Sequence, residues 1–275
     1  MGPFRLNEVA GPYWPFRTVP IAADAADDEL VAWLARAKPG TAWRLGPAYA
    51  DDLAVARLVA ISERAGWRVL RRRLAEAYYV DLEGLAASGP WPATKTLRKN
   101  RWLERRLEEQ GALQFRTVSG ADWSEEVLET LRRIEGESWV GRSAEARDTK
   151  FLHGPNLDHW RRAIQDPVLA GLLSCSLLTI GGEPAAFTFR LRAGDTLHFI
   201  ANSYAERFAA GSPGRVLLYR DFQQAAAEGV RRIGWGAGDP GYKSEMGAEA
   251  GPAIEDLLFV RNRALAALLR PIWER

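Results

Sequence analysis

The chain has 275 residues, of which 47% are hydrophobic and 26% charged, so it can bury a substantial core and is long enough for two domains. Lysine and arginine (37 residues) nearly balance aspartate and glutamate (35), which excludes a protein whose whole surface is basic for nucleic-acid binding. No apolar run approaches the roughly 20 residues of a membrane span, and the sequence predicts a cytoplasmic protein without one.

Cysteine and histidine are too sparse for a disulfide framework or a metal centre. Cys175 is the single cysteine and lies in the apolar run LLSCSLLTI, which indicates a buried side chain. His153 and His159 are six residues apart with a Gly-Pro between them, which is not the spacing of a helical metal pair. We therefore expect no metal site.

The first third of the chain alternates strand-like and helix-like patterns, which predicts a small α/β or α+β layer. The predicted elements are a strand at 16–21, a helix at 27–38, a strand at 41–46, a helix at 51–66, and paired strands formed by WRVLRRR and EAYYVDL.

A strongly charged helix is predicted at 94–110, after a proline- and glycine-containing stretch and before Gly111. We place the domain boundary here, which gives domains 1–110 and 111–275. Five side chains of this helix share a face by their spacing of three or four residues: Lys95, Arg98, Lys99, Trp102 and Arg106. Two readings stay open, a solvated face balanced by glutamates and a contact for a phosphate-bearing substrate or an RNA acceptor stem.

The second part predicts the order β-α-α-β-β-β-α-β-β, a mixed sheet with helices on its faces. Its elements are a strand at 113–118, helices at 124–139 and 157–166, three strands between 169 and 204, a helix at 213–229, the strand RRIGWG, and a last strand IEDLLFVRN.

The helix at 213–229 begins with a sequence suited to anion binding. Ser212 is a good N-cap residue, Pro213 suits the first helical position, and Gly214 lets a ligand approach the backbone. The N–H groups of Gly214, Arg215 and Val216 are then expected to be free and to point out of the helix end with its positive dipole. An ordinary well-capped helix has the same sequence, so this signal is weak alone.

The loop GDPGYKSEMG (238–247) follows the strand RRIGWG and carries Lys243, one of five lysines beside 32 arginines. An ammonium is a compact charge, unlike the planar fork of arginine, and it can stabilise a negative oxygen or donate to a carbonyl. A surface lysine in a turn is the alternative.

Four stretches taken together resemble the GNAT superfamily, and more closely the two-domain group of CelD-like cellulose-biosynthesis acyltransferases and Fem aminoacyl transferases. They are TLRKNRWLERRLEEQG, like that group's arginine-rich helix; EGESWVGR, like its helix end with Glu and Trp; AGSPGRVLLYRDFQQAAAEGVRRIGWG; and GDPGYKSEMG.

The resemblance implies tandem GNAT-like domains, each a mixed, mostly antiparallel sheet flanked by helices, with an activated acyl group bound mainly by the second domain. It implies donor-binding residues at the helix start and on the strand before it: Ser212, Pro213, Gly214, Arg215, Val216 and Asn202. The full Gln/Arg-x-x-Gly-x-Gly/Ala signature of standard GNAT enzymes is absent, so the donor stays open between acyl-CoA and aminoacyl-tRNA.

The same resemblance implies acyl transfer, in which an amine or hydroxyl attacks a thioester or ester carbonyl. The motif Tyr242-Lys243-x-x-x-Gly247 is similar to the Phe/Tyr-Lys-x-x-Phe-Gly motif of the Fem enzymes, with Met246 in the aromatic position and Lys243 at the developing oxyanion. The other candidates are catalytic Asp239, Tyr242 and Glu245, with Glu137 and Tyr204 as further bases, and acceptor-side Trp139, Tyr204, Arg98 and Lys99. Trp139 at a helix end is equally typical of core packing.

Three functions remain open. The favoured one is an acyltransferase that moves an acyl group from acyl-CoA, for example acetyl-CoA, to an amine or hydroxyl of a small-molecule or sugar-linked acceptor. The rival uses aminoacyl-tRNA and forms a peptide bond, with the helix at 94–110 holding the RNA. The third is a binding protein that keeps the fold without catalysis. We expect no DNA partner, and the sequence does not set the oligomeric state.

Overall fold

The computed structural model describes residues 6–8, 17–37, 40–89, 91–143, 149–238 and 241–275. Its contacts divide the chain into two compact units, Met1–Ala77 with Ala250–Arg275, and Tyr78–Glu249. These bounds differ from the expected division after residue 110. The basic helix groups with the second unit, and the last strand and helix group with the first.

The first unit is a four-stranded sheet in the order β1-β2-β9-β3. Strand β2 pairs with β1 in parallel and with β9 antiparallel. The elements are β1 (Leu6–Glu8), α1 (Asp27–Arg36), β2 (Ala42–Tyr49), α2 (Leu53–Arg64), β3 (Arg68–Asp81, whose end belongs to the second unit), β9 (Glu249–Val260) and α11 (Arg263–Trp273).

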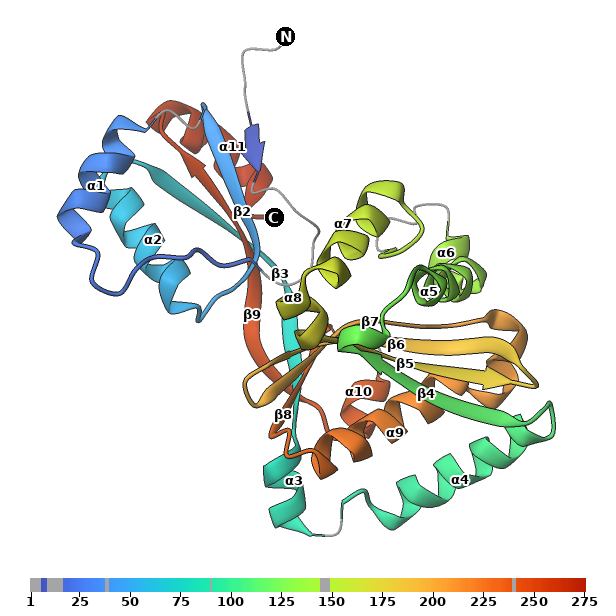
Figure 1. Ribbon diagram of the computed structural model, residues 1–275. Coiled ribbons are helices and arrows are strands. Elements are labelled where there is room, and N and C mark those ends of the chain that lie inside the picture. Colours follow the sequence, from blue (N-terminus) through green and yellow to red (C-terminus); the bar gives the residue numbers. More distant parts are fainter. Residues whose placement is uncertain (1–5, 9–16, 38–39, 90, 144–148, 239–240) are drawn as a thin grey trace. The chain divides into compact units, whose positions relative to one another are not determined.

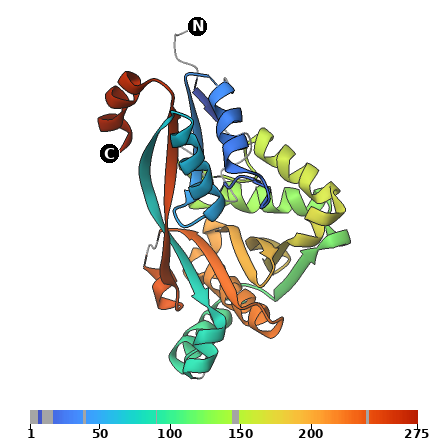
Figure 2. The same ribbon diagram turned by 90° about the vertical axis from the view of Figure 1, so that its left-hand side faces the viewer.

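Alternation along β9 places a helix layer on each face of this sheet. Leu257 and Phe259 pack with side chains of α2, among them Val55. Leu258 and Val260 point to the other face and pack with Ala266 of α11 and its neighbours. Figure 2 shows α11 on one side of these strands and α1 and α2 on the other.

A buried carboxylate holds three strands of the first unit together. Asp256 of β9 is fully buried, and its Oδ2 atom accepts hydrogen bonds from Arg44 of β2 (2.8 Å) and Arg72 of β3 (2.5 Å). Both guanidinium groups are partly exposed, so the carboxylate carries most of the desolvation cost and depends on these donors.

The second unit has the strand order β8-β7-β6-β5-β4. Neighbouring strands pair antiparallel except β7 and β8, which are parallel. Its elements are α3 (Leu82–Ser88), α4 (Thr94–Glu108), β4 (Leu113–Ser119), α5 (Glu125–Glu137), α6 (Trp139–Arg142), α7 (Gly154–Gln165), α8 (Pro167–Leu172), β5 (Leu173–Ile180), β6 (Glu183–Ala193), β7 (Thr196–Tyr204), α9 (Pro213–Ala227), β8 (Arg232–Ala237) and α10 (Tyr242–Glu245), with short 3-10 turns at Gly120–Asp122 and Glu206–Gly211.

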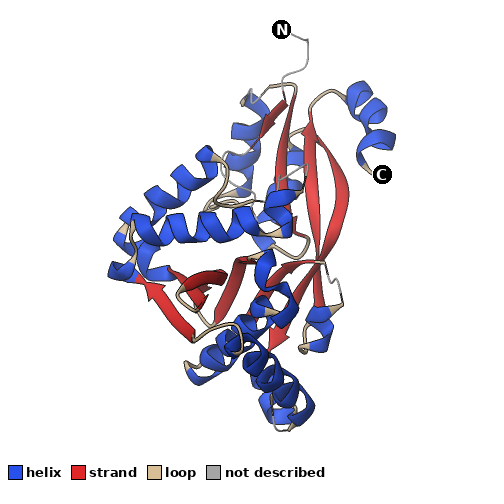
Figure 3. Cartoon of the chain, turned by 90° about the vertical axis from the view of Figure 1, so that its right-hand side faces the viewer, coloured by secondary structure: helices blue, strands red, loops and turns tan. Residues whose placement is uncertain are grey.

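Helices cover both faces of this sheet (Figures 1 and 3). Phe187 and Phe189 of β6 face one layer, where Phe151 and Trp160 pack edge-on against them. The opposite face carries Leu178, Ala186 and their neighbours, which pack with the buried side of α9 and with Leu103 and Leu107 of α4. Side chains alternate every two residues along the strands and repeat every 3.6 residues along the helices, so each face of the sheet has its own apolar core with the helices that cover it.

Local sequence fixes the ends of the helices. The Asp52 carboxylate accepts hydrogen bonds from the N–H groups of Ala54 and Val55, both at 2.9 Å, and so starts α2. Gly111 follows α4 with φ +151°, and a Cβ atom there would lie 2.7 Å from the backbone nitrogen of Gly181. Glycine is therefore required both by the turn and by the close approach of the next hairpin.

Most predicted elements are confirmed, and a mixed, mostly antiparallel sheet flanked by helices is the observed fold. Two predictions are wrong. The described residues of the expected strand at 16–21 form no strand. The two strands expected between 67 and 82 are one continuous strand, β3, because the residues between WRVLRRR and EAYYVDL contain no turn-forming glycine, proline or asparagine. The order expected for the second part is found, with the short helices α6, α8 and α10 and the final helix α11 added.

Removing the Asp256 carboxylate is expected to destabilise the first unit. Asp256→Ala leaves two inward-facing arginines without their common acceptor, and we expect the free energy of unfolding to fall by about 3–5 kcal/mol, measured by urea denaturation. The matched control is Glu255→Ala, whose partner Arg71 is about half exposed, with an expected loss below about 1 kcal/mol. Equal losses in the two variants would contradict the structural role of Asp256.

Candidate functional site

Strands β7 and β8 pair with each other only where they begin. The paired residues are Thr196 with Arg232, Leu197 with Ile233 and His198 with Gly234. Both strands continue past the last pair, β7 to Tyr204 and β8 to Ala237. Backbone groups on the facing sides of these carboxyl ends therefore do not bond each other and need other partners.

Helix α9 begins shortly after β7 ends, as predicted, but Ser212 does not cap it in the predicted way. Ser212 lies in the left-handed region (φ 52°, ψ 54°), and its side chain makes no capping hydrogen bond. A side-chain cap needs an extended backbone at that position. Among the described residues other than glycine, Ser212 alone has a positive φ, which concentrates backbone strain at this turn.

The expectation of three free N–H groups at this helix start is also wrong. The N–H groups of Arg215 and Val216 donate to the carbonyl of Ser212, at 3.0 and 3.2 Å, because the carbonyl of the N-cap residue accepts the first hydrogen bonds inside a helix. Gly214 remains the candidate for ligand contact. A Cβ atom on it would lie 3.1 Å from Cδ1 of Tyr204, so β7 and the helix start are in close contact.

Three predicted site residues from three helices meet in one ion-pair cluster. Arg215 Nη1 lies 3.0 Å from Oε2 of Glu245, and Lys99 Nζ lies 3.7 Å from the same oxygen. Arg215, and after it Lys99, lowers the pKa of Glu245. A carboxylate with a lowered pKa is a weak base, so this geometry favours Glu245 as a partner of Arg215 over a proton acceptor.

Lys243 is buried, so the alternative that it is a surface lysine in a turn is wrong. Its side chain is 5% exposed, and Nζ donates to the carbonyls of Trp235 (2.7 Å) and Ala237 (3.0 Å). Both carbonyls belong to the part of β8 beyond its last pair with β7. The ammonium also lies 5.7 Å from the ring centre of Tyr78. Lys243 thus anchors α10 to the end of β8.

The rest of the motif packs around this anchor. Tyr242 packs edge-on against Trp235, with ring centres 5.5 Å apart. Met246 is 6% exposed and joins the core that contains Phe222 and Trp235, so it fills the place of the aromatic residue expected from the resemblance. Next to it is a pocket of about 220 Å³. Its mainly apolar lining includes Leu85, Trp91, Pro92, Phe222 and Met246. Asp239 lies outside the described residues.

The other predicted side chains do not join the cluster. Trp139 is 65% exposed at the start of α6, so the core-packing alternative is wrong and its place at an acceptor pocket stays a prediction. Glu137 pairs with Arg133 and Arg207. Asn202 is exposed on β7 opposite Thr188, and Arg98 lies along a groove on α4.

The sequence analysis missed a buried polar network under α9. The carboxylate of Asp221 accepts hydrogen bonds from Ser176 (2.6 Å) and Thr188 (2.5 Å), and Arg190 Nη1 lies 2.7 Å from it. Asp221 and Arg190 are 2% and 4% exposed. Burial raises the pKa of Asp221, and Arg190 and the two hydroxyls oppose that rise. The sequence feature that could have indicated this network is an acidic residue, Asp221, within the apolar face of the helix, next to Leu218 and Phe222.

Two further observations concern metal and membrane chemistry. Across the described residues, no group of three or more histidine, cysteine, aspartate or glutamate side chains could hold a metal ion. Within those same ranges no helix is long and apolar enough to cross a bilayer. Cys175 is fully buried, as expected, and burial raises its pKa to about 12, which makes it an inert thiol.

Removal of the Lys243 ammonium is expected to loosen the site. Lys243→Met keeps most of the side-chain volume but leaves the Trp235 and Ala237 carbonyls without their charged donor. We expect the free energy of unfolding to fall by about 2–4 kcal/mol in urea denaturation. Lys95→Met, at an exposed lysine of α4, is the control and is expected to change it by less than about 0.5 kcal/mol. If Lys243→Met left the free energy of unfolding unchanged, these hydrogen bonds would not anchor α10.

Solved structures share this fold at low sequence identity. L-PGS from Bacillus licheniformis matches with 18% identity and a TM-score of 0.53, over 85% of this chain and 73% of that one. The C-terminal domain of a putative lysylphosphatidylglycerol synthetase from Agrobacterium fabrum matches with 18% identity and a TM-score of 0.54, over 88% and 75%. FemX matches with 13% identity and a TM-score of 0.54, over 89% and 79%. No curated protein matches the sequence.

The family comparison covers the elements that build the site. The model described as "Acetyltransferase (GNAT) domain" matches residues 94–244, which is more than half of the chain. The match begins with α4 and ends in α10, so it contains the start of α9, the ends of β7 and β8, and Lys243. The chain belongs to the GNAT acetyltransferase family.

Proposed function

We propose that the protein transfers an acyl group from acyl-CoA, in the simplest case acetyl-CoA, to an amine or hydroxyl of a small-molecule or sugar-linked acceptor. The observation that carries the proposal is the end of the pairing between the parallel strands β7 and β8. We propose the start of α9, which follows β7, as the anion contact for the donor. Lys243 bonds two carbonyls of β8 beyond its paired part, and we propose its ammonium as the charge that offsets the carbonyl oxygen during transfer.

The donor's charged end fits the start of α9. The proposed contacts are the N–H of Gly214 and the guanidinium of Arg215, whose side chain is 18% exposed. Backbone N–H groups at a helix start and an arginine fork together suit a pyrophosphate. The amide groups of the pantetheine arm can bond the backbone of β7 beyond His198. The full proposed donor set is Ser212, Pro213, Gly214, Arg215, Val216 and Asn202.

In the proposed reaction, stabilising the negative charge on the carbonyl oxygen matters more than a general base. The amine nitrogen attacks the thioester carbonyl carbon, the carbonyl oxygen gains negative charge, the C–S bond breaks, and the amine proton leaves to the thiolate or to water. A fixed ammonium offsets the oxyanion without reorganising during the step, which is the role proposed for Lys243. An acceptor that arrives as the neutral amine needs no strong base from Asp239, Tyr242 or Glu245.

The acceptor side is proposed from Lys99 of the ion-pair cluster and from three side chains that do not belong to the cluster. Lys99 and Arg98 of α4 offer positive charge, and Tyr204 and Trp139 offer aromatic surface. The apolar pocket beside Met246 has Glu245 at its edge and suits a hydrocarbon or aromatic portion of acyl group or acceptor.

A Fem-like reaction from aminoacyl-tRNA is the second candidate. Helix α4 exposes Arg98, Arg101, Arg105 and Trp102, and Arg106 stacks over the Trp102 ring at 5.0 Å. A basic face with an aromatic platform is typical of single-stranded nucleic-acid contacts. The fold shared with FemX is consistent with this alternative. A protein that binds the donor without turnover is the third candidate.

Acyl transfer is tested by mass spectrometry of pooled amines incubated with acyl-CoA. We expect Lys243→Ala to lower the single-turnover rate by about 10²-fold or more, the usual cost of losing an oxyanion donor. Lys95→Ala is expected to keep the wild-type rate. Lys243→Ala with full transfer and an intact fold would exclude the catalytic role, and CoA binding without turnover by the wild type would favour the third candidate.

Donor choice is tested by binding. Arg215→Ala is expected to weaken CoA binding about tenfold through loss of a charge-assisted contact, measured by calorimetry. Arg162→Ala on α7 is the control and is expected to bind like the wild type. Absence of CoA binding together with tRNA binding that falls steeply with salt would replace acyl-CoA by aminoacyl-tRNA.

A further inference from the structure

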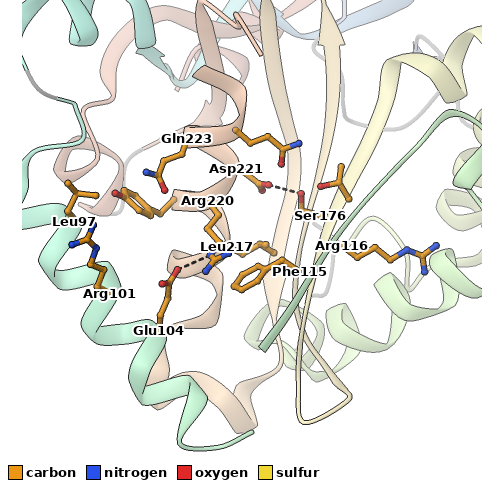
Figure 4. A pocket seen from close by; sticks show the side chains of 13 residues that line it. Leu97, Arg101, Glu104, Phe115, Arg116, Ser176, Leu217, Arg220, Asp221 and Gln223 are labelled. Carbon is orange, nitrogen blue, oxygen red and sulfur yellow. Dashed lines mark hydrogen bonds and ion pairs between the residues drawn. The ribbon is translucent and has the colours of Figure 1, made fainter. Parts of the chain in front are cut away.

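A second cavity lies in the same unit but contains none of the predicted site residues. It has a volume of about 460 Å³ and lies between α4, α9 and the strands β4 and β5 (Figure 4). Its polar and charged lining includes Arg101, Glu104, Arg116, Tyr219, Arg220 and Asp221. A cavity of this size accommodates a small organic molecule.

The acidic groups of this lining already have partners. Asp221 is held by Ser176, Thr188 and Arg190 through both of its oxygens. Glu104 Oε1 accepts a hydrogen bond from Arg220 Nε at 2.8 Å. Figure 4 shows the Ser176–Asp221 and Glu104–Arg220 contacts as dashed lines. The cavity therefore offers a ligand few negative groups.

Arg220 belongs to the wall of the cavity. Its guanidinium carbon lies 3.7 Å from the ring centre of Phe115, in addition to its bond to Glu104. A guanidinium held on an aromatic face and by a carboxylate is fixed in place. Arg116 also contributes to the lining, but its side chain points away from Asp221 and Glu104 in Figure 4.

Tyr219 carries a buried donor that lacks a partner. The residue is 6% exposed, and its hydroxyl is buried without a hydrogen bond among the described residues. Arg101 and Glu104 line the same cavity as Tyr219. Burial raises the pKa of the Tyr219 hydroxyl, Arg101 opposes that rise, and Glu104 adds to it. A buried hydroxyl without a partner destabilises the protein, and a ligand that accepts a hydrogen bond from it would remove that cost.

Arg101 contributes a positive charge to the lining of the cavity. It faces the cavity from α4, and within the described ranges no hydrogen bond or ion pair engages its guanidinium. Arg101 and Tyr219 come from two helices that contact each other, and both line the cavity. Gln223 adds an amide to the same wall.

We propose that this cavity binds a small organic anion whose carboxylate or phosphate group accepts hydrogen bonds from the Arg101 guanidinium and the Tyr219 hydroxyl. The ligand supplies the acceptor and the negative charge that Arg101 and Tyr219 lack in the free protein, and it connects α4 to α9. The site is separate from the proposed donor site, which lies at the first turn of α9, and it does not depend on the proposed function.

The test uses the full chain with two probes, citrate for carboxylates and inorganic phosphate for phosphate groups, at constant ionic strength set with sodium chloride. Binding is measured by calorimetry and by the melting temperature. We expect one probe to bind saturably and to raise the melting temperature by several degrees, and the probe that binds identifies the ligand class. No saturable binding of either probe would overturn the proposal.

Variants locate the binding. Arg101→Ala and Tyr219→Phe are each expected to weaken it at least tenfold. The matched control Arg105→Ala, one turn further along the exposed side of α4, and Arg215→Ala at the proposed donor site are expected to change it less than twofold. Equal weakening by Arg105→Ala would mean general attraction to a basic helix, and weakening by Arg215→Ala would move the ligand to the donor site. Either result overturns the proposal.

Tyr219→Phe gives an independent readout without any ligand. It removes only the hydroxyl oxygen and its proton, so the melting temperature of the unliganded protein is expected to stay the same or to rise. A clear fall would show that the hydroxyl already has a partner in the free protein, and the inference would fail on that ground.

Discussion

The carboxylate of Asp221 holds helix α9 on the sheet, and the rest of the second unit depends on that position. It receives hydrogen bonds from β5 through Ser176 and from β6 through Thr188, and Arg190 completes its neutralisation. A buried pair of this kind adds little net stability, because desolvation offsets the attraction, but its directional bonds permit few alternative arrangements. Helix α9 therefore lies in a defined register on the sheet, with its first turn beside β7 and its middle turns beside the cavity that faces α4.

Lys243 is a second buried polar anchor, and it holds helix α10 at the end of β8. Lys243 satisfies two carbonyls of the strand beyond its pairing with β7, and it thereby fixes the short helix α10. Glu245 of the same helix then reaches Arg215 and Lys99. Structural anchoring and a role in acyl transfer are compatible, since a charge fixed by backbone carbonyls is already oriented before the reaction begins.

The sequence predicted most helices and strands of the second unit because hydrophobic periodicity and turn residues are local properties. It also placed Cys175 in the core and located the helix start at Ser212 and the loop around Lys243. The conformation of Ser212 was not predictable, since serine is also an ordinary capping residue and nothing local shows that the chain turns left-handed there. The exposure of Trp139 was not predictable either, because an aromatic residue at a helix end is equally typical of core packing and of a binding pocket unless the neighbouring elements are known.

The amino-acid sequence by itself determined the order of the main elements of the second part, the family resemblance and the residues of the motif GDPGYKSEMG. Only the tertiary structure decided which groups meet: Lys243 with the carbonyls of β8, Glu245 with Arg215 and Lys99, and Asp221 with side chains from two strands. The physical reason is that pairings between elements depend on register and on the packing of helices over a sheet, which neither spacing nor composition encodes. A buried acid or an unpaired hydroxyl such as that of Tyr219 becomes visible only when its surroundings are known.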